Sequence, residues 1–309
     1  MPLNLPKPIK NNSTIGLLCP ASGFDDYKPI ELVIKYLKSN GFKVKTGKYL
    51  LSLKKDYKYL SGTDKQRLTD FMSLWTDKDI DAIFCLRGGY GCLRLLNQID
   101  FAKVKKTKKI LLGFSDITVL HMALFAKCNL VTFHGPLLGY KFIDKHLNPV
   151  NRETHNSMWK ILRDENFDFK YSFKNSGTVI KPGKATGVLI GGNLTDICSM
   201  IGSRYLPSFK DTIFFLEDCY EEPYRIDRLL TQIVDAHLLD RVKGFLFTSF
   251  YKCKFKNNKQ VINLIKDKVL QYNVPIIYNI PIGHDRKNFT VPIGKKVVLD
   301  ADNLILKSY

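Results

Sequence analysis

The chain contains no long run of uncharged apolar residues. Its apolar stretches stay short of the roughly 18 residues that a membrane-spanning helix needs. Residues 1–8 are interrupted by prolines and lack the apolar core of a signal peptide. Internal repeats and low-complexity tracts are also absent. These absences predict a cytoplasmic protein with no membrane span.

The sequence also lacks the patterns of metal and disulfide sites. It has 7 cysteines, an odd number, and most of them, such as Cys198 and Cys219, lie inside apolar runs. Cys85 and Cys92 are too far apart for a metal knuckle, and no histidine cluster accompanies them. A dinucleotide-binding fingerprint is incomplete, because its third glycine would fall at Arg94. We therefore predict free buried thiols and neither a metal nor a cofactor.

Acidic residues are scarce relative to basic ones: 48 lysines and arginines oppose 29 aspartates and glutamates, for a net charge of +19. Lysine clusters at 103–109 and 252–256 are of a kind that binds nucleic acid. However, lysines far outnumber arginines, and no nucleic-acid-binding motif with interleaved aromatics is present. We expect a solvated basic surface that attracts an anionic substrate, with no nucleic-acid partner.

What is present is an alternation of strand and helix patterns. Apolar runs at 14–19 and 81–86 predict buried strands, and helical periodicity marks residues 29–40 and 64–75. This rhythm predicts a Rossmann-like α/β fold, of the flavodoxin or amidotransferase kind, in which helices flank a mostly parallel sheet. We assign this N-terminal domain to residues 1–145.

The remainder of the chain has a different pattern. Residues 146–180 are polar and mixed in charge, which predicts a linker or crossing segment. Residues 181–309 contain shorter strand patterns and a well-marked helix at 223–236. We therefore expect a smaller, mixed, β-rich α/β domain there, with the active site in the cleft between the two domains.

Ser115 is the strongest candidate nucleophile. It follows the buried strand pattern at 110–114 and opens a helical segment, so its hydroxyl would stand clear of the sheet beside a helix N-terminus. Ile117 stands where the closing glycine of an esterase elbow would be, which argues against an α/β-hydrolase. Taken alone, Ser115 or Asp116 could equally be a helix cap.

Two other strand patterns end on residues that complete a triad. The run at 212–216 ends on Glu217 and Asp218, and the run at 274–280 leads through proline and glycine to His284. Imidazole suits a general base near neutral pH. The glycine-rich turn at 88–91 offers backbone N–H groups that can hold an oxyanion or a phosphate.

The ordered set of motifs resembles the LD-carboxypeptidases, a serine-peptidase family that also includes the microcin C immunity peptidase. The matching segments, in family order, are RGGYG at 87–91, GFSD at 113–116, GGNL at 191–194, FLED at 215–218 and IGH at 282–284.

The resemblance implies a catalytic Ser115, a base His284 and an orienting Glu217, with Asp218 as the local competitor of Glu217. It also implies an oxyanion hole formed by the N–H groups of Gly89 and Asp116. The implied reaction removes the terminal D-Ala from the meso-diaminopimelate of murein tetrapeptide stems, in peptidoglycan recycling, by a homodimeric enzyme that needs no metal.

Recognition of the substrate carboxylates should fall to arginine, and Arg87 and Arg204 are the candidates. Three alternatives remain at this point. One is an immunity-type peptidase that cleaves an aminoacyl-adenylate-like amide, for which Trp159 is the aromatic candidate. A second has Cys219 as the nucleophile. The third is a nonenzymatic basic module that binds nucleic acid.

Overall fold

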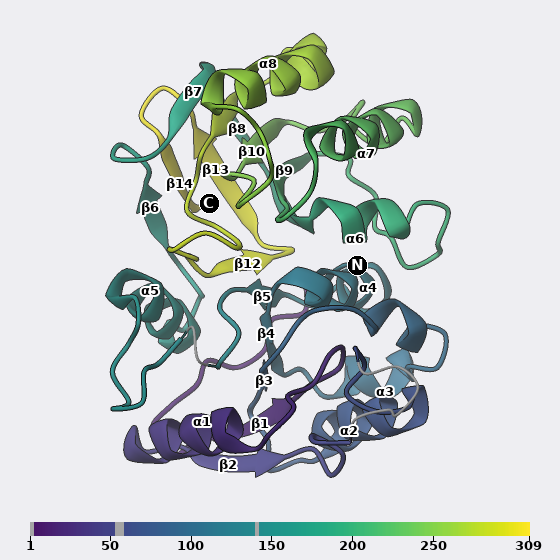
Figure 1. The fold of residues 1–309 in the computed structure, drawn as a ribbon, viewed down its shortest axis with the longest axis vertical. Coiled ribbons are helices and arrows are strands. Elements are labelled where there is room, and N and C mark those ends of the chain that lie inside the picture. The colour runs from purple at the N-terminus through teal and green to yellow at the C-terminus, as the bar shows by residue number, and fades with distance from the viewer. Residues whose placement is uncertain (1–2, 53–58, 140–141) are drawn as a thin grey trace.

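The computed structural model describes residues 3–52, 59–139 and 142–309. Its strands form two sheets that lie one above the other in Figure 1. The first sheet has the strand order β12 (Val291–Ile293), β5 (Thr132–His134), β4 (Ile110–Gly113), β3 (Ala82–Cys85), β1 (Thr14–Leu18) and β2 (Lys43–Thr46). Neighbours from β5 to β2 are parallel, whereas β12 runs antiparallel to β5.

The second sheet is mixed. Its strand order is β6 (Lys170–Ser172), β14 (Ile305–Ser308), β13 (Lys296–Asp300), β8 (Lys184–Asn193), β9 (Thr212–Glu217), β10 (Gly244–Phe247), β11 (Ile276–Tyr278) and β7 (Thr178–Lys181). The central strands β8 to β11 are parallel, and the outer strands pair antiparallel. A parallel centre buried on both faces suits the uniformly buried apolar residues of β9 and β10.

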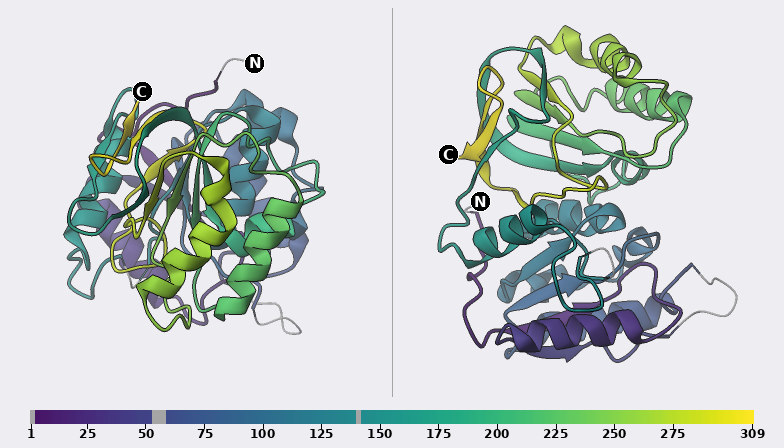
Figure 2. Two further views of the ribbon diagram at one scale, coloured as in Figure 1. Left: turned by 90° about the horizontal axis from the view of Figure 1, so that it is seen from above. Right: turned by 60° about the vertical axis from the view of Figure 1, so that its left-hand side comes forward.

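Helices connect these strands, and local signals set several of their ends. They are α1 (Lys28–Ser39), α2 (Asp64–Thr76), α3 (Phe101–Lys106), α4 (Thr118–Cys128), α5 (Arg152–Arg163), α6 (Leu194–Ser199), α7 (Pro223–Asp235) and α8 (Asn258–Val269), with 3₁₀ turns η1 (Cys92–Leu95), η2 (Ser115–Ile117) and η3 (Leu270–Tyr272). Thr63 and Gln66 form a capping box at the start of α2. Proline occupies the first turn of α1 and of α7. In Figures 1 and 2, α7 and α8 lie on the side of the second sheet away from the N-terminal half.

The predicted fold class is confirmed: a parallel-rich sheet flanked by helices is joined to a second, β-rich sheet. Two details differ from the expected domain layout. The 146–180 segment, expected as a linker or crossing segment, contains α5, β6 and most of β7, and these two strands belong to the second sheet. The late strand β12 crosses back to pair with β5, because antiparallel pairing there covers an otherwise open sheet edge.

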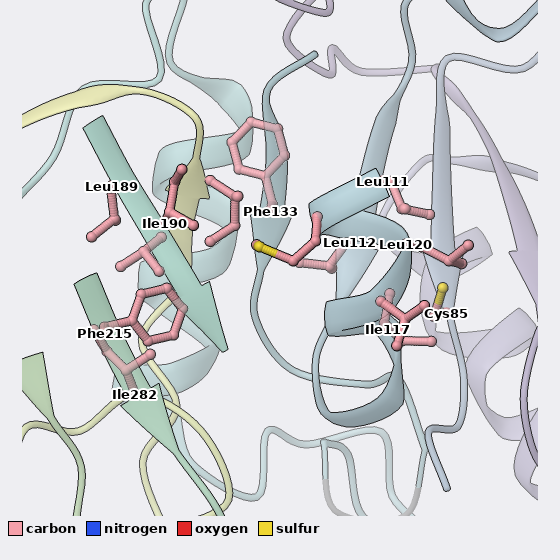
Figure 3. Close-up of a cluster of buried hydrophobic side chains, with 14 of the residues drawn as sticks. Cys85, Leu111, Leu112, Ile117, Leu120, Phe133, Leu189, Ile190, Phe215 and Ile282 are labelled. Carbon is pink, nitrogen blue, oxygen red and sulfur yellow. The ribbon is translucent and has the colours of Figure 1, made fainter. Parts of the chain in front are cut away.

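The two halves share one hydrophobic core. Figure 3 shows Leu189, Ile190 and Phe215 of the second sheet on one side, with Leu112 and Phe133 of the first sheet facing them. All five side chains are fully buried. Burial of apolar surface across this boundary contributes about 25 cal/mol per Å², so it opposes separation of the two halves.

A polar contact reinforces this boundary at the start of α4. The Thr118 hydroxyl accepts a hydrogen bond of 3.0 Å from the backbone N–H of Asn193. A Cβ atom on Gly192 would lie 2.4 Å from Thr118 Oγ1, so only glycine permits this approach. The GGNL segment of the sequence therefore joins the two halves directly beside the nucleophile turn.

Within the described residues, no helix is both long enough and apolar enough to cross a membrane.

Candidate active site

Ser115 lies at the turn between β4 and the helical segment η2–α4. Phe114 is extended, and Ser115 then adopts a left-handed conformation with φ of 64°. Such a conformation costs a residue other than glycine roughly 1–2 kcal/mol, and strain of this kind is concentrated at functional sites. The backbone turn therefore presents the Ser115 side chain at the end of the sheet, as the sequence pattern predicts.

The glycine-rich turn packs directly against this serine. A Cβ atom on Gly88 would lie 2.8 Å from Ser115 Cβ, so a larger residue at position 88 would displace the serine. Gly89 has a φ of 102°, and a Cβ atom there would lie 2.2 Å from Ser22 Oγ. Glycine at 88 thus permits the close approach of this turn to Ser115, and glycine at 89 permits its approach to Ser22.

Asp116 holds the two turns together through its side chain. Its carboxylate accepts a 2.8 Å hydrogen bond from the backbone N–H of Cys92, the first residue of η1. Burial raises the pKa of this carboxyl, and the hydrogen bonds with Cys92 partly oppose that rise. The Asp116 side chain therefore has a structural task, which leaves its backbone N–H as the group relevant to an oxyanion.

His284 and Glu217 form a buried pair. Nδ1 of His284 lies 2.5 Å from Oε2 of Glu217, and the Glu217 side chain is only 1% exposed. Glu217 ends β9, and His284 follows Gly283, whose φ is 108°. A Cβ atom on Gly283 would lie 2.9 Å from Glu217 Oε2, so glycine at 283 is what admits the carboxylate to this position. Asn288 accepts a 2.9 Å hydrogen bond from the Gly283 N–H and fixes the loop.

The pair changes the acid–base behaviour of the imidazole. Burial by itself lowers the pKa of His284, but the negative charge of Glu217 and the hydrogen bonds of the imidazole with Cys219 and Glu217 outweigh it and raise the pKa above its ordinary value. Because a carboxylate at 2.5 Å stabilises the imidazolium strongly, the upward direction follows from the geometry.

The acidic neighbours of these two residues have other partners. Asp218 accepts hydrogen bonds from the Asn193 amide and from the hydroxyl and backbone N–H of Thr195, so it ties β9 to α6. Burial, together with the Glu217 charge, raises the pKa of Asp218 to about 6. Asp285 accepts a hydrogen bond from the Arg286 N–H. Glu217 is thus the carboxylate that contacts His284.

Ser115 and His284 line the same cavity, which is about 450 Å³ in volume. Both halves of the chain contribute to it, and its lining residues are Phe24, Leu86, Arg87, Gly88, Gly89, Phe114, Ser115, Pro136, Leu137, Gly139, Phe142, Asn151, Thr154, Gly283, His284, Asp285, Arg286 and Asn288. The Phe114 ring packs edge-on against the His284 ring, with centroids 4.7 Å apart. The aromatic contact and the Glu217 contact together orient the imidazole at the cavity wall.

The structure separates the two candidate arginines. Arg87 lines the cavity, lies over the Phe24 ring at 5.7 Å and donates a hydrogen bond to the Gly23 carbonyl. Arg204 does not line it and instead lies against Tyr205, with its guanidinium 2.9 Å from the tyrosine oxygen. Arg286, which the sequence reasoning missed, does line the cavity. Its signal in the sequence was a cation two residues after His284.

Trp159, the aromatic candidate, and the buried histidine His121 are held away from the cavity by packing. Trp159 is buried and stacks on Phe42 with centroids 5.0 Å apart. His121 is buried between Thr132 and the Gly113 carbonyl, and burial lowers its pKa to about 4. Phe24 and Phe142 line the cavity, whereas Trp159 does not.

The cysteines follow the prediction from the sequence. All 7 are free, and 5 of them are buried. Cys219 follows the Glu217–Asp218 pair and is not among the residues that line the cavity. In the described part of the chain, no group of histidine, cysteine and carboxylate side chains is arranged to hold a metal ion.

This geometry defines a class of protein: a two-domain α/β enzyme with a serine and a carboxylate-paired histidine at the domain boundary. Residues 15–135 match the LD-carboxypeptidase N-terminal domain family, and residues 186–299 match the LD-carboxypeptidase C-terminal domain family. The chain therefore belongs to the LD-carboxypeptidase family and is a serine-type carboxypeptidase.

Individual relatives agree with this placement. The probable murein peptide carboxypeptidase of Bacillus subtilis (strain 168) is 33% identical over 299 residues, covering 96% of this chain and 91% of the relative. The structure of the wild-type microcin C7 self-immunity protein MccF in its apo state superposes with a TM-score of 0.86 at 25% identity, covering 99% of this chain and 98% of MccF. The muramoyltetrapeptide carboxypeptidase of Oxalobacter formigenes gives a TM-score of 0.77 at 27% identity, with 96% and 97% covered.

Proposed function

We propose that this protein hydrolyses the bond between meso-diaminopimelate and D-Ala in murein tetrapeptide stems, through a Ser115–His284–Glu217 triad. The observation that carries the proposal is the 2.5 Å contact between His284 and Glu217 at the wall of the cavity that Ser115 also lines. Names of relatives that act on murein peptides support the choice of substrate.

In the proposed reaction, His284 accepts the Ser115 proton while Ser115 Oγ bonds to the amide carbonyl carbon. Because Nδ1 faces Glu217, Nε2 is the nitrogen left for this transfer. The tetrahedral oxyanion is held by the N–H groups of Gly89 and Asp116, whose turns pack together as described.

Collapse of this intermediate breaks the C–N bond, and His284 gives its proton to the departing amine of D-Ala. An acyl-enzyme remains on Ser115. A water molecule, deprotonated by His284, then attacks the ester and restores the serine. All steps use groups of this chain and one water.

Two arginines of the cavity, Arg87 and Arg286, are placed to pair with substrate carboxylates. The planar guanidinium suits bidentate pairing with a carboxylate. Arg204 lies outside this cavity, so we assign it no part in binding at this site. The cytoplasmic location, the role in recycling and the homodimer stay predictions.

A second candidate keeps the triad and changes the amide. Phe24 and Phe142 line the cavity and offer aromatic surface on which a nucleobase can stack, as required by an aminoacyl-adenylate-like substrate. The murein assignment is favoured because the cavity also presents two arginines for a peptide's carboxylates.

The deciding experiment is mass spectrometry of a synthetic tetrapeptide ending in meso-diaminopimelate-D-Ala. Wild type should release D-Ala, and Ser115→Ala should lower the rate by at least about 10⁴-fold. Ser208→Ala, at an exposed serine outside the cavity, is the matched control and should retain the wild-type rate. Excess chelator should leave the rate unchanged.

An intact tetrapeptide after incubation with folded wild type would overturn the murein assignment. Parallel incubation with an aminoacyl sulfamoyl adenosine and an aminoacyl phosphoramidate of adenosine would then test the second candidate. Activity that chelator abolishes and zinc restores would contradict the metal-free triad.

A further inference from the structure

The position of His284 identifies which part of a substrate occupies the cavity. In the proposed reaction His284 protonates the departing amine, so the residue that leaves must lie on the His284 side of Ser115. The cavity extends along the chain segment that follows His284, through Asp285, Arg286 and Asn288. We call the cavity described above the leaving-residue cavity.

The walls of the leaving-residue cavity are largely apolar. One group of lining residues is aliphatic or aromatic, and it comprises Phe24, Leu86, Phe114, Pro136, Leu137 and Phe142. Leu86 is 2% exposed and Phe142 is 3% exposed, so both are fixed by packing. Phe142 also packs against Tyr36, with ring centroids 5.8 Å apart, which holds this wall in place.

The cavity is much larger than D-Ala requires. Its volume of about 450 Å³ lies within the range of roughly 300–1,000 Å³ that accommodates drug-sized ligands. A methyl side chain would leave most of the apolar wall in contact with water. A larger apolar side chain would cover that wall, and burial of apolar surface is favourable by about 25 cal/mol per Å².

The charged groups of the cavity fit a free α-carboxylate. Arg286 and Arg87 both line it, and the Arg87 guanidinium donates to a backbone carbonyl rather than to a carboxylate. Asp285, the acidic residue of the lining, accepts a hydrogen bond from a backbone N–H. The cavity thus combines the guanidinium groups of Arg87 and Arg286, which suit the α-carboxylate of the leaving residue, with an apolar region that suits the side chain of that residue.

We propose that the leaving-residue cavity accepts terminal D-residues with large apolar side chains, such as D-Leu, D-Met and D-Phe, in addition to D-Ala. This inference rests on the proposed function and specifies its substrate class. The chemistry is unchanged: water is added across the amide, and the larger D-amino acid leaves with the proton from His284.

The test is a panel of peptides that share one acyl part and end in D-Ala, D-Leu, D-Phe or D-Asp. We expect kcat/KM for D-Leu and D-Phe to be equal to or up to about tenfold above that for D-Ala, mainly through a lower KM. The D-Asp peptide should be at least about tenfold poorer than D-Leu, because its side-chain carboxylate would be desolvated against the apolar wall.

Gly139 allows the cavity to be narrowed. A Cβ atom there would lie 3.6 Å from the Leu86 carbonyl oxygen and 3.7 Å from the Phe24 ring, which is ordinary contact. Gly139→Leu should therefore lower kcat/KM for D-Phe at least tenfold more than for D-Ala, and Gly139→Ala should change that ratio little. Within one variant, the ratio of kcat/KM for the D-Phe peptide to kcat/KM for the D-Ala peptide does not depend on the fraction of folded protein.

The outcomes separate the inference from the proposed function. Cleavage of the D-Ala peptide with D-Leu and D-Phe more than 100-fold poorer would overturn the inference and leave the proposed function in place. Failure to cleave all four peptides would overturn both. Unchanged ratios in Gly139→Leu would show that this cavity does not hold the departing residue.

Discussion

Ser115 and His284 line the same cavity from the two halves of the molecule, but different features hold them there. On the Ser115 side the backbone is decisive: a parallel strand ends, the serine takes a left-handed conformation, and the glycine turn packs against it. On the His284 side a long loop carries the residue, and a buried carboxylate orients it. One half thus relies on turn geometry, and the other relies on electrostatics.

The two sides of the site should respond differently to pH and salt. Backbone geometry set by packed strands is insensitive to pH and salt, whereas an ion pair depends on the protonation of both partners. Variants of the His284 side should therefore change the pH profile, and variants of the Ser115 side should change stability or the overall rate.

Removing the Glu217 charge should strongly lower the rate. In Glu217→Gln we expect kcat to fall by about 10³- to 10⁴-fold, because the imidazole loses its orientation and the stabilisation of its charged form. The Glu217 charge raises the pKa of His284, so its loss should move the acid limb of the pH–rate profile to lower pH. The measurement is kcat/KM between pH 5 and 10.

The free energy of unfolding should also depend on pH through the His284–Glu217 pair, and the raised pKa of His284 sets the direction of this dependence. The folded-state pKa of His284 is raised above its ordinary value of 6.5, so the stabilisation from the pair is fully present below about pH 6.5 and is lost as the pH rises through the raised pKa. The matched control for the pH–rate profile of Glu217→Gln is Asp218→Asn, because Asp218 bonds to Thr195 and Asn193 rather than to His284. An equal shift of the acid limb in both variants would contradict the assignment of Glu217.

Gly283→Ala should lower kcat by about 10²-fold. The added Cβ would lie 2.9 Å from Glu217 Oε2, so the carboxylate must move away from His284. The control is Gly41→Ala, which has a similarly positive φ of 82° but no atom within 4 Å of the new Cβ. Steady-state kinetics of both variants separates the clash from simple backbone strain, which costs both of them stability. Equal rates in the two variants would contradict the positional role of Gly283.

Thr118→Val should destabilise the protein by about 1–3 kcal/mol, because the buried N–H of Asn193 loses its acceptor. Thr69→Val on the exposed face of α2 is the control, since its hydroxyl bonds only to a carbonyl of its own helix. Urea denaturation monitored by fluorescence gives the free energies of unfolding. A Thr118→Val value no larger than that of the control would show that this hydrogen bond does not join the halves.

The smallest effect concerns the strain at Ser115. Ser115→Gly should be more stable than Ser115→Ala by about 1 kcal/mol, because glycine adopts a φ of 64° without steric cost. At Ser73, an exposed residue inside α2, the order should reverse by a similar amount, since glycine is unfavourable in a helix. Thermal unfolding of the four variants tests this, and the same order at both sites would show that Ser115 is unstrained.

The sequence alone determined the local elements and the candidate residues. Alternating apolar and helical patterns placed α1, α2, α4 and α7 within a few residues, because the 3.6-residue period and proline or glycine signals are local. Strand ends that finish on Ser115, Glu217 and near His284 identified two residues that line one cavity, Ser115 and His284, and the carboxylate that contacts His284. Such signals require no knowledge of distant contacts.

Tertiary structure decided the rest. Strands β6 and β7 are short and exposed, and their sequences contain no strong pattern, so only pairing with β14 and β11 defines them. The return of β12 to the first sheet is equally invisible locally, because β-pairing is a contact between remote segments.

The same reason applies to the site. From the sequence, Arg87 and Arg204 were equal candidates for carboxylate recognition. In the folded chain Arg87 lines the cavity together with Arg286, and Arg204 does not. The fold also chose Glu217 over Asp218 as the partner of His284, because a glycine at 283 leaves room for one carboxylate and the other is bound by α6. Residue types and their order along the chain follow from the sequence, whereas which charges meet depends on packing between segments far apart in it.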